Sequence, residues 1–451
     1  MATTYLTRTA TANNNSVGKW TFSAWIKRNA LNTESNIISF YSSGASRSAL
    51  RFDSDDKLRF YEVTSNSTIV TKLTNRLFRD SGAWYHIMLA VDKTLGSPET
   101  EIYVNGVQET DFATDDGYTQ NEAGNFNQAL PIYINAENPG TGVGDCVMSH
   151  VHFIDGTKYG PTTFGSFDSS TGEWKINTTP SVTYGTNGFF ILKDSNSVTD
   201  QSGNSNNFTV GAGTLLETKD NPSNNFPILN RDIPATPPTS DIGGALQIKK
   251  TNSGYKPGLA TFGAFAGKFY AEFKLESDYG YLNFGVVNAF KKARLGTGDS
   301  LDYIGDGDDG VAYQPGSSAL YYNGGTVGSY GTAAQNDIIG IALDIDNGYV
   351  YWSKNGTYLN SGVPTSAGSG TGGYALSNLE STLGNYYIFG VSVAGTSGTR
   401  KISCNFGQGF FGTTAVSSNS GNGYAGAEGN SKFYYQPPTG FSAMNTKGLN
   451  A

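Results

Sequence analysis

Two stretches far apart in the sequence carry the same hairpin pattern. Residues 338–356 read IIGIALDIDNGYVYWSKNG, and residues 84–106 read WYHIMLAVDKTLGSPETEIYVNG. In each, an apolar run reaches an Asp, a turn follows, a β-branched or aromatic run returns, and the chain closes on Asn-Gly. Asn-Gly supplies the positive φ angles that a tight hairpin turn needs. The pattern predicts an antiparallel hairpin in each stretch and a chain with two β-rich parts.

Apolar and polar residues alternate around these hairpins. In WTFSAWIKR (20–28), Trp20 and Phe22 fall on one face of an extended chain, and Thr21 and Ser23 fall on the other. An alternation of period two is typical of a strand with one buried face. Similar runs recur at a spacing of about 10 residues, which is typical of antiparallel sandwiches. No convincing amphipathic helix interrupts them, so the chain is predicted to be all-β.

The composition supports a folded chain and limits its partners. Tyr and Phe number 27 and 26, which favours strands. The net charge of −8 argues against nucleic acid as a partner, because such a protein needs a basic face. The two cysteines, Cys146 and Cys404, are expected to be buried free thiols. Since the sequence shows neither an apolar leader nor a membrane-spanning run, we expect synthesis in a host cytoplasm without a signal peptide.

Composition divides the chain into four segments. Strand patterns fill residues 1–168 and 241–412, which we predict to be two sandwiches. Residues 169–240 are rich in Asn, Ser, Gly and Thr and end in a Pro-Pro pair. They predict a stiff connector whose two short strands, GFFILKD and NNFTVG, lean on a neighbour. Residues 413–451 form a polar tail that cannot build a core alone and is expected to lie on a domain or a neighbouring subunit.

Both β-rich parts resemble known families of sandwich. WYHIMLAVD followed by IYVNG resembles the hairpin of laminin G-like, concanavalin A-like jelly rolls. DIIGIALDIDNGYVYWSKNG resembles the SPRY family, and GKFYAEFKLE and CNFGQGFFG are similar to the first and last strands of that family. The resemblances imply two concanavalin A-like antiparallel β-sandwiches, a laminin G-like one before the connector and an SPRY-like one after it.

The order of the motifs is similar to that in virion structural proteins of tailed bacteriophages. FIDGTKYGPTTFGSFDSSTGEWK is followed by the SPRY-like part and then by PPTGFSAMNTKGLN. This resemblance implies a fibre, spike or decoration protein on the virion surface, with other virion proteins as partners. By analogy with phage appendages, we expect a homo-oligomer and favour a trimer.

The sequence lacks the catalytic motifs that such folds can carry. Glycoside hydrolases use paired carboxylates, which concanavalin A-like enzymes place on one strand as E-x-D-x-x-E. Glu276, Asp278 and Tyr281 come nearest to this spacing, but a tyrosine replaces the second glutamate. A Gly-x-Ser-x-Gly nucleophile motif is absent from the sequence as well. We therefore expect a protein without enzymatic activity, with a polysaccharide depolymerase as the less favoured alternative.

Three groups of residues are candidates for a metal ion, and the weakest of them is Asp53, Asp55 and Asp56. Asp306, Asp308 and Asp309 form a carboxylate-rich loop, and oxygen ligands of this kind bind Ca²⁺. The loop lacks the closing Glu of an EF-hand, however, and Gly-Asp runs are also ordinary turns. His150 and His152 share a strand face, but the expected strand would fill these positions anyway, so they are predicted to be structural. No cofactor is required, and calcium is the one that the sequence leaves open.

Loops with tyrosine and aspartate predict a ligand site in the SPRY-like part. Sugars stack their C–H faces on aromatic rings, while Asn and Asp form hydrogen bonds with sugar hydroxyls. Tyr279, Tyr281 and Tyr313 could line the same face as these loops. The candidate ligand-binding residues are Tyr303, Asp306, Asp308, Tyr321, Tyr322 and Asn323.

Two lectin-like sandwiches without a catalytic motif point to a non-catalytic adsorption module. We expect a host-surface polysaccharide as the ligand, because sites for sugars combine apolar area with a few placed polar groups. The alternative is a purely architectural protein that decorates the capsid or tail, since the polar connector and tail would suit contacts with neighbours.

Overall fold

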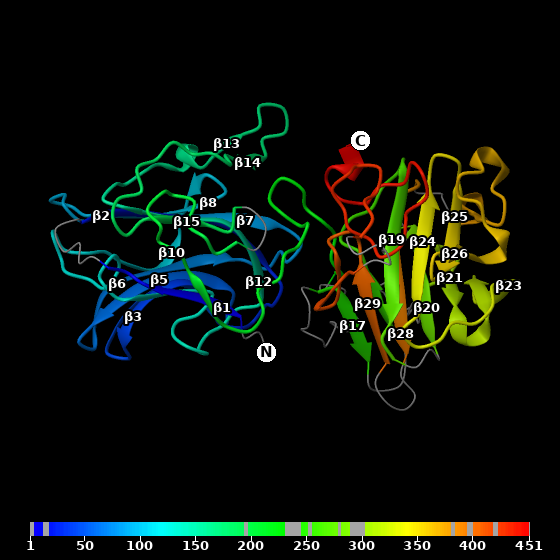
Figure 1. Cartoon of the computed structure of the whole chain (residues 1–451), viewed down its shortest axis with the longest axis horizontal. Helices are drawn as coiled ribbons and strands as arrows, with labels where there is room; N and C mark the ends of the chain where they lie inside the picture. Colours follow the sequence, from blue (N-terminus) through cyan, green and yellow to red (C-terminus); the bar gives the residue numbers. More distant parts are fainter. Residues whose placement is uncertain are drawn as a thin grey trace. The chain divides into compact units, whose positions relative to one another are not determined.

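The chain is almost entirely β-structure, as the alternation predicts, and the computed structural model divides it into two compact units (Figure 1). Unit 1 comprises Met1–Glu217 and unit 2 comprises Thr218–Ala451. Helical residues in the described part of the chain occur as short 3-10 turns, none of them long and apolar enough to cross a bilayer. The structure describes residues 4–11, 18–193, 197–230, 245–250, 255–277, 281–288, 303–379, 384–394, 400–417 and 423–450.

Unit 1 contains two large antiparallel sheets and a small hairpin. Its strands are rich in Val, Ile, Phe, Tyr and Thr, which fit a pleated and half-buried surface. Its elements are β1 (Tyr5–Thr9), β2 (Lys19–Arg28), β3 (Ser35–Ser43), β4 (Ser46–Phe52), β5 (Lys57–Thr64), β6 (Ser67–Leu77), β7 (Trp84–Asp92), β8 (Glu99–Val104), β9 (Val107–Gln108), β10 (Phe112–Asp116), β11 (Pro131–Ile134), β12 (Cys146–Asp155), η1 (Pro161–Thr163), β13 (Gly165–Phe167), β14 (Trp174–Ile176), β15 (Phe189–Ile191) and β16 (Thr209–Ala212).

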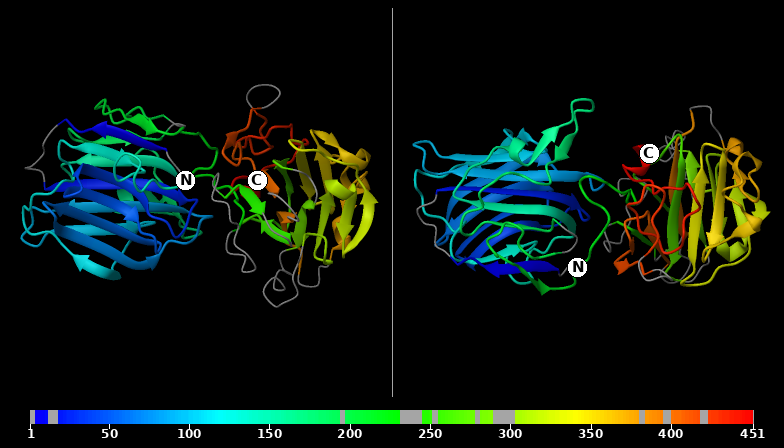
Figure 2. Two further views of the ribbon diagram at one scale, coloured as in Figure 1. Left: turned by 90° about the horizontal axis from the view of Figure 1, so that it is seen from below. Right: turned by 45° about the horizontal axis from the view of Figure 1, so that its top comes forward.

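The two sheets of unit 1 lie in two layers around one core (Figure 2). The larger sheet has the strand order β10-β6-β5-β4-β3-β11-β1-β16, and the smaller has the order β15-β12-β2-β7-β8-β9. Aromatic rings fill the centre of the core, where Trp20 stacks on Phe126 with ring centroids 4.3 Å apart. The predicted sandwich is thus confirmed for this unit.

Strand β2 differs from the half-buried strand that the alternation predicts. Its inner residue Trp20 joins the core, but its outer residue Trp25 is buried as well. The reason is that Trp174, on β14, packs against Trp25 and Trp84 and covers this face of the sheet. A Cβ atom at Gly106 would lie 2.3 Å from the Trp174 ring, so the covering side chain fits only over glycine.

Unit 2 is a second antiparallel sandwich with a separate core. Its elements are β17 (Gln247–Lys250), β18 (Tyr255–Leu259), β19 (Lys268–Leu275), β20 (Leu282–Asn288), β21 (Gly310–Gln314), η3 (Pro315–Ser317), β22 (Ala319–Tyr322), β23 (Gly325–Ser329), β24 (Ile338–Asp344), β25 (Tyr349–Lys354), β26 (Thr357–Tyr358), η4 (Leu359–Ser361), η5 (Ala367–Ser369), β27 (Tyr374–Ala375), η6 (Leu376–Asn378), β28 (Tyr387–Ala394), β29 (Arg400–Asn405), β30 (Phe410–Phe411), β31 (Thr414–Ala415) and η7 (Gly448–Asn450).

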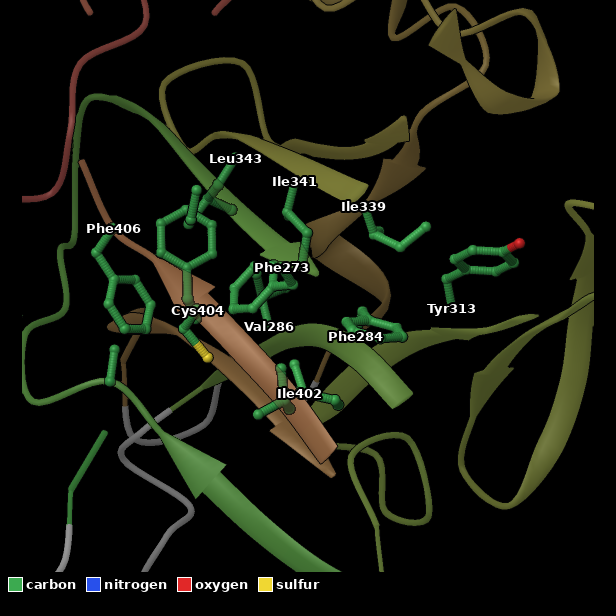
Figure 3. Packing of buried hydrophobic residues seen from close by; sticks show 14 of the residues in the cluster. Phe273, Phe284, Val286, Tyr313, Ile339, Ile341, Leu343, Ile402, Cys404 and Phe406 are labelled. Carbon is green, nitrogen blue, oxygen red and sulfur yellow. The ribbon is translucent and has the colours of Figure 1, made fainter. Parts of the chain in front are cut away.

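Two sheets enclose the core of unit 2. One has the order β17-β29-β19-β24-β25-β26, with β27 also paired to β25, and the other has the order β18-β28-β20-β21-β22-β23. Apolar side chains from both sheets interdigitate, among them Phe273, Ile341 and Phe284 (Figure 3). Trp352, on β25, links the two sheets by donating its Nε1–H to the backbone oxygen of Phe284, on β20, at 2.8 Å. Cys404 is a buried free thiol, as predicted, whereas Cys146 of unit 1 is a free thiol that is only partly buried.

The two hairpins of the sequence share one pair of hydrogen bonds. In unit 1, the side-chain oxygen of Asn105 accepts a hydrogen bond from the N–H of His86 at 2.7 Å, and the Asn105 N–H donates to the His86 oxygen at 2.9 Å. In unit 2, Asn355 makes the same two bonds with Ile338, both at 2.9 Å. Each Asn-Gly therefore ties the end of the returning strand to the start of the first one.

The predicted connector, residues 169–240, divides between the two units. Its strand β15 pairs with β12, and its strand β16 pairs with β1, so both extend the sheets of unit 1. Phe226 and Leu229 lie in the apolar clusters of unit 2 instead. The Pro-Pro pair and the predicted boundary at residue 240 lie outside the described residues.

The polar tail packs on unit 2 itself. The Tyr270 N–H donates to the Ser442 oxygen, and the Ser442 N–H donates to the Lys268 oxygen, each at 2.9 Å. Phe433 and Phe441 form an apolar cluster with Tyr270. The tail therefore covers the outer face of the sheet that contains β19.

Candidate functional site

The candidate site lies over the outer face of the six-stranded sheet of unit 2. This face carries three buried polar side chains, those of Asn283, Gln314 and Ser392. Gln314 Nε2 donates to Asn283 Oδ1 at 2.8 Å, and Asn283 Nδ2 donates to the oxygen of Ile304 at 3.2 Å. Ser392 Oγ accepts from the Ile304 N–H at 2.9 Å. These bonds hold residues 303–309, here called the aspartate loop, on the sheet.

Glycine makes room for the aspartate loop. A Cβ atom at Gly390 would lie 2.5 Å from Cδ1 of Ile304, which packs with Leu259 and Val287 in a small apolar cluster. The loop is thus anchored by its backbone and by one buried side chain. Because both anchors are short-range contacts with a sheet, the loop presents its remaining side chains in fixed positions.

Four tyrosines gather around the docked loop. We call Tyr255, Tyr281, Tyr303 and Tyr321 the tyrosine patch. The ring of Tyr303 lies 4.7 Å from that of Tyr255 and 5.9 Å from that of Tyr321, measured between centroids. The Tyr281 ring lies 6.3 Å from that of Tyr255, and Tyr281 is 49% exposed. Residues from β18, β22 and the aspartate loop therefore form one aromatic surface that solvent can reach.

The aspartate loop also meets the β22–β23 turn. The N–H of Asn323 donates to the Gly307 oxygen at 3.1 Å, and the N–H of Gly324 donates to the Gly305 oxygen at 3.0 Å. Asn323 is exposed at the tip of this turn, and Asp306 lies beside it and is partly exposed. The structure thus brings Asp306, Asn323, Tyr303 and Tyr321 together, although they are distant in sequence.

Tyr322 is separated from this group. Successive side chains in a strand point to opposite faces, so Tyr321 and Tyr322 diverge. The Tyr322 hydroxyl donates to the Asn378 oxygen at 2.6 Å, and its ring lies 6.0 Å from that of Tyr374. Tyr313 is fully buried in the core, and Tyr279 lies outside the described residues.

Burial affects the protonation of one tyrosine of the patch. It raises the pKa of Tyr255 to about 12, and the neighbouring tyrosines act in the same direction. The phenol of Tyr255 is therefore neutral at physiological pH and keeps its proton for hydrogen bonding.

A metal site is not assembled from the residues that were candidates for one. Across the described ranges, no three His, Cys, Asp or Glu side chains are grouped so that they could hold an ion. Asp309 is buried, whereas Asp306 and Asp308 are partly exposed.

The buried histidines belong to the packing of unit 1. Trp174 Nε1 donates to Nδ1 of His86 at 3.1 Å, and Nε2 of His86 lies 2.8 Å from Ser23 Oγ. Burial lowers the pKa of His86 to about 3, so its ring is neutral. His152 stacks on Phe190 with centroids 3.9 Å apart, and burial lowers its pKa as well.

Sequence reasoning missed Tyr255 and the polar anchors of the loop. A signal was present, because Asn283 in YLNFGVVN and Ser392 in IFGVSVAG each place a polar residue inside an apolar strand. Such residues need hydrogen-bond partners when the strand is buried. The partner here is the backbone of a loop, which no local pattern identifies.

Two parts of the chain match known families. Residues 2–146 match the concanavalin A-like lectin/glucanases superfamily, and residues 268–408 match the SPRY domain. The chain therefore carries a concanavalin A-like domain and an SPRY domain. The tyrosine patch extends on both sides of the start of the SPRY match, since Tyr255 precedes it. No curated protein sequence matches the chain.

Three solved structures are similar to parts of this chain at low sequence identity. The SPRY domain of human HERC1 is 16% identical, with 35% of this chain and 87% of that chain covered and a TM-score of 0.27. A native heptameric SAP-like pentraxin from Limulus polyphemus is 16% identical, with 35% and 71% covered and a TM-score of 0.25. Stonustoxin is 14% identical, with 40% and 27% covered and a TM-score of 0.27.

Proposed function

We propose that this chain is a non-catalytic protein of a bacteriophage virion that binds a host-surface glycan through the tyrosine patch of its SPRY domain. The observation that carries the proposal is the convergence of Tyr255, Tyr281, Tyr303 and Tyr321 beside Asn323. Aromatic area with a few placed polar groups is the usual make-up of a site for a small ligand or a sugar.

The patch offers a sugar two kinds of contact. The Tyr303 and Tyr321 rings stand at 86° to each other, so a pyranose ring can stack on one and lie along the edge of the other. Asn323 and Asp306 then provide hydrogen bonds for its hydroxyl groups. The carboxylate of Asp306 favours neutral glycans over acidic ones, because like charges repel.

The virion setting rests on the sequence resemblance to phage structural proteins. A fibre, spike or decoration protein would contact other virion proteins, and we propose a homotrimer by analogy with phage appendages. The proposal needs no cofactor. Calcium at Asp306, Asp308 and Asp309 would be an addition, which chelation with EDTA in the binding assay tests.

Binding by the full chain tests this proposal. Purified protein would be applied to glycan arrays and to whole host cells, with Tyr303→Ala and Tyr321→Ala as variants. Losing one stacked ring should weaken binding about tenfold. Phe265→Ala is the matched control, because Phe265 is an aromatic side chain of unit 2 that is 77% exposed and lies outside the patch. Wild-type binding by both tyrosine variants, with unchanged thermal unfolding, would refute the assignment.

The architectural alternative is favoured by one observation. Strand β23 reads GTVGS, is largely exposed, and among the described strands pairs only with β22. An uncharged edge strand can pair with a strand of another subunit. Particles that lack this protein would assemble and stay stable yet fail to adsorb if it is an adhesin, whereas unstable particles would favour decoration. Incubation with host polysaccharide should produce no shortening, and shortening would establish a depolymerase.

A further inference from the structure

Asn-Gly pairs recur in this sequence, and one of them differs from the others in the hydrogen bonding of its asparagine side chain. They begin at residues 105, 187, 323, 347, 355 and 422, and the last of these lies outside the described residues. An asparagine followed by glycine is the pair most open to spontaneous deamidation, because glycine leaves its own backbone nitrogen unshielded. A hydrogen bond to the asparagine side chain slows the reaction by holding the amide away from that nitrogen.

Hydrogen bonds hold the side-chain amide at four of these positions. Asn105 Oδ1 accepts from the His86 N–H at 2.7 Å, as described for the first hairpin. The other three donate through Nδ2: Asn187 to Asn127 Oδ1 at 3.1 Å, Asn347 to Asp344 Oδ2 at 2.7 Å, and Asn355 to Asp337 Oδ1 at 2.7 Å.

Asn323 has no such restraint. It is exposed at the tip of the β22–β23 turn, with φ of 49°, and Gly324 follows with φ of 68°. Nothing in the described part of the chain forms a hydrogen bond with its side-chain amide. One restraint on the reaction remains, because the N–H of Gly324 donates to the Gly305 oxygen at 3.0 Å. The nitrogen becomes reactive whenever this hydrogen bond opens.

We propose that Asn323 is a deamidation site and that its conversion switches off the ligand site beside it. The backbone nitrogen of Gly324 loses its proton to hydroxide and attacks Cγ of Asn323. A new C–N bond forms, the bond from Cγ to Nδ2 breaks, and ammonia leaves. Water then opens the cyclic imide at either carbonyl carbon, giving aspartate or isoaspartate. The net reaction consumes one water and releases one ammonia, without any redox change.

The product changes the surroundings of the patch in two ways. The Oδ1 atom of Asp306 lies 3.9 Å from the Cβ position built on Gly324, so a carboxylate at 323 adds a like charge next to an existing one. Isoaspartate also lengthens the backbone of the turn, which misaligns the bonds from residues 323 and 324 to the aspartate loop. Both effects weaken the binding of a neutral glycan, a consequence that rests on the proposed function.

The modification is tested by mass, without any ligand. The full chain is held in mildly alkaline buffer at physiological temperature, and peptides are mapped by mass spectrometry over time. The peptide with Asn323 should gain about 1 Da at a rate at least about tenfold above the peptides with residues 105, 187, 347 and 355. Isoaspartyl methyltransferase should label the same peptide. Equal rates at these positions, or an unchanged Asn323, would overturn the proposal. Asn323→Gln should abolish the labelling there.

The effect on binding is tested with Asn323→Asp. Asn66→Asp is the matched control, because Asn66 also occupies an exposed hairpin turn with positive φ of 65°, in unit 1. Binding to the glycan or host cell should fall about tenfold for Asn323→Asp and stay unchanged for the control. Full binding by Asn323→Asp would refute the switch. Deamidation at Asn323 in a protein that binds no glycan would refute the proposed function alone and uphold the modification site.

Discussion

Replacing Glu272 with Gln should change how the stability of unit 2 depends on pH. Glu272 is fully buried on β19, and its carboxylate accepts hydrogen bonds from the N–H groups of Tyr434 and Tyr435 at 2.8 and 2.7 Å. Asn405 Nδ2 donates to the same carboxylate at 3.1 Å. Burial raises the pKa of Glu272 from its ordinary value of 4.5 to about 7, although these hydrogen bonds act against the increase.

The sign and size of the effect follow from this difference in pKa. Between pH 4.5 and about 7 the folded protein holds the proton of Glu272 more tightly than the unfolded chain does. The stabilisation is complete below pH 4.5 and is lost as the pH rises through about 7. At about 1.36 kcal/mol for each unit of pKa difference, the loss amounts to about 3 kcal/mol. Gln does not titrate, so the variant should lack this slope, and its mismatched amide should cost about 1–3 kcal/mol at every pH.

Hydrogen exchange measures this locally. Exchange of the peptide that contains Tyr434 and Tyr435 would be followed from pH 5 to pH 8 and corrected for the intrinsic rates. Wild-type protection should fall as the pH rises, while Glu272→Gln should show weaker but pH-independent protection. Glu276→Gln serves as the control, because Glu276 directly follows β19 and is partly exposed. An identical pH slope in wild type and Glu272→Gln would refute the reasoning.

Three further predictions follow from the buried contacts. Unit 1 should lose stability as the pH falls below 6.5, because burial lowers the pKa of His86 to about 3 and only the unfolded chain can bind the proton. His86 alone contributes about 1.4 kcal/mol per pH unit, and His152, whose pKa is also lowered, adds to the slope. Urea unfolding followed by tryptophan fluorescence checks this, with His86→Gln as the variant that should show a flatter dependence. Gly390→Val should displace Ile304 and cost about 1–3 kcal/mol in thermal unfolding, because its Cβ would lie 2.5 Å from Cδ1 of that residue. Ser392→Ala removes the acceptor of the Ile304 N–H, so peptide mapping should show faster deamidation at Asn323, and an unchanged rate would contradict the anchoring role.

Local chemistry made the hairpins predictable. The closing Asn355-Gly356 depends on neighbours in sequence and has the positive φ angles that the pattern predicts. The β24–β25 hairpin also occurs where the pattern places it, but its loop spans residues 345–348, and in its Asn-Gly pair only Gly348 has a positive φ. The all-β sandwiches were predictable for the same reason, since strand alternation needs only a few consecutive residues.

The burial of a strand face by residues distant in sequence was not predictable. The outer face of β2 is buried because Trp174 reaches it from a separate hairpin, and alternation carries no information about that hairpin. The site shows the same limit. Tyr303 and Tyr321 were identified from composition, but Tyr255 joins them only through the pairing of β18 with β28. The split of Tyr321 from Tyr322 does follow from strand alternation, once the strand itself is known.

The path of the tail has a consequence for synthesis. Phe226, near the start of unit 2, belongs to the apolar cluster around Tyr270. Phe433 and Phe441, more than 200 residues later in the sequence, pack into the same cluster. A ribosome makes Phe433 and Phe441 after the strands that contain Tyr270 and Tyr351, so this face of the sheet stays uncovered until residues 433–441 have emerged. Unit 1 can fold while unit 2 is still being translated. Unit 2 can complete its own fold only after residues 433–441 have been made. A stalled or prematurely released chain would therefore expose an apolar sheet face and would become a target for chaperones and proteases.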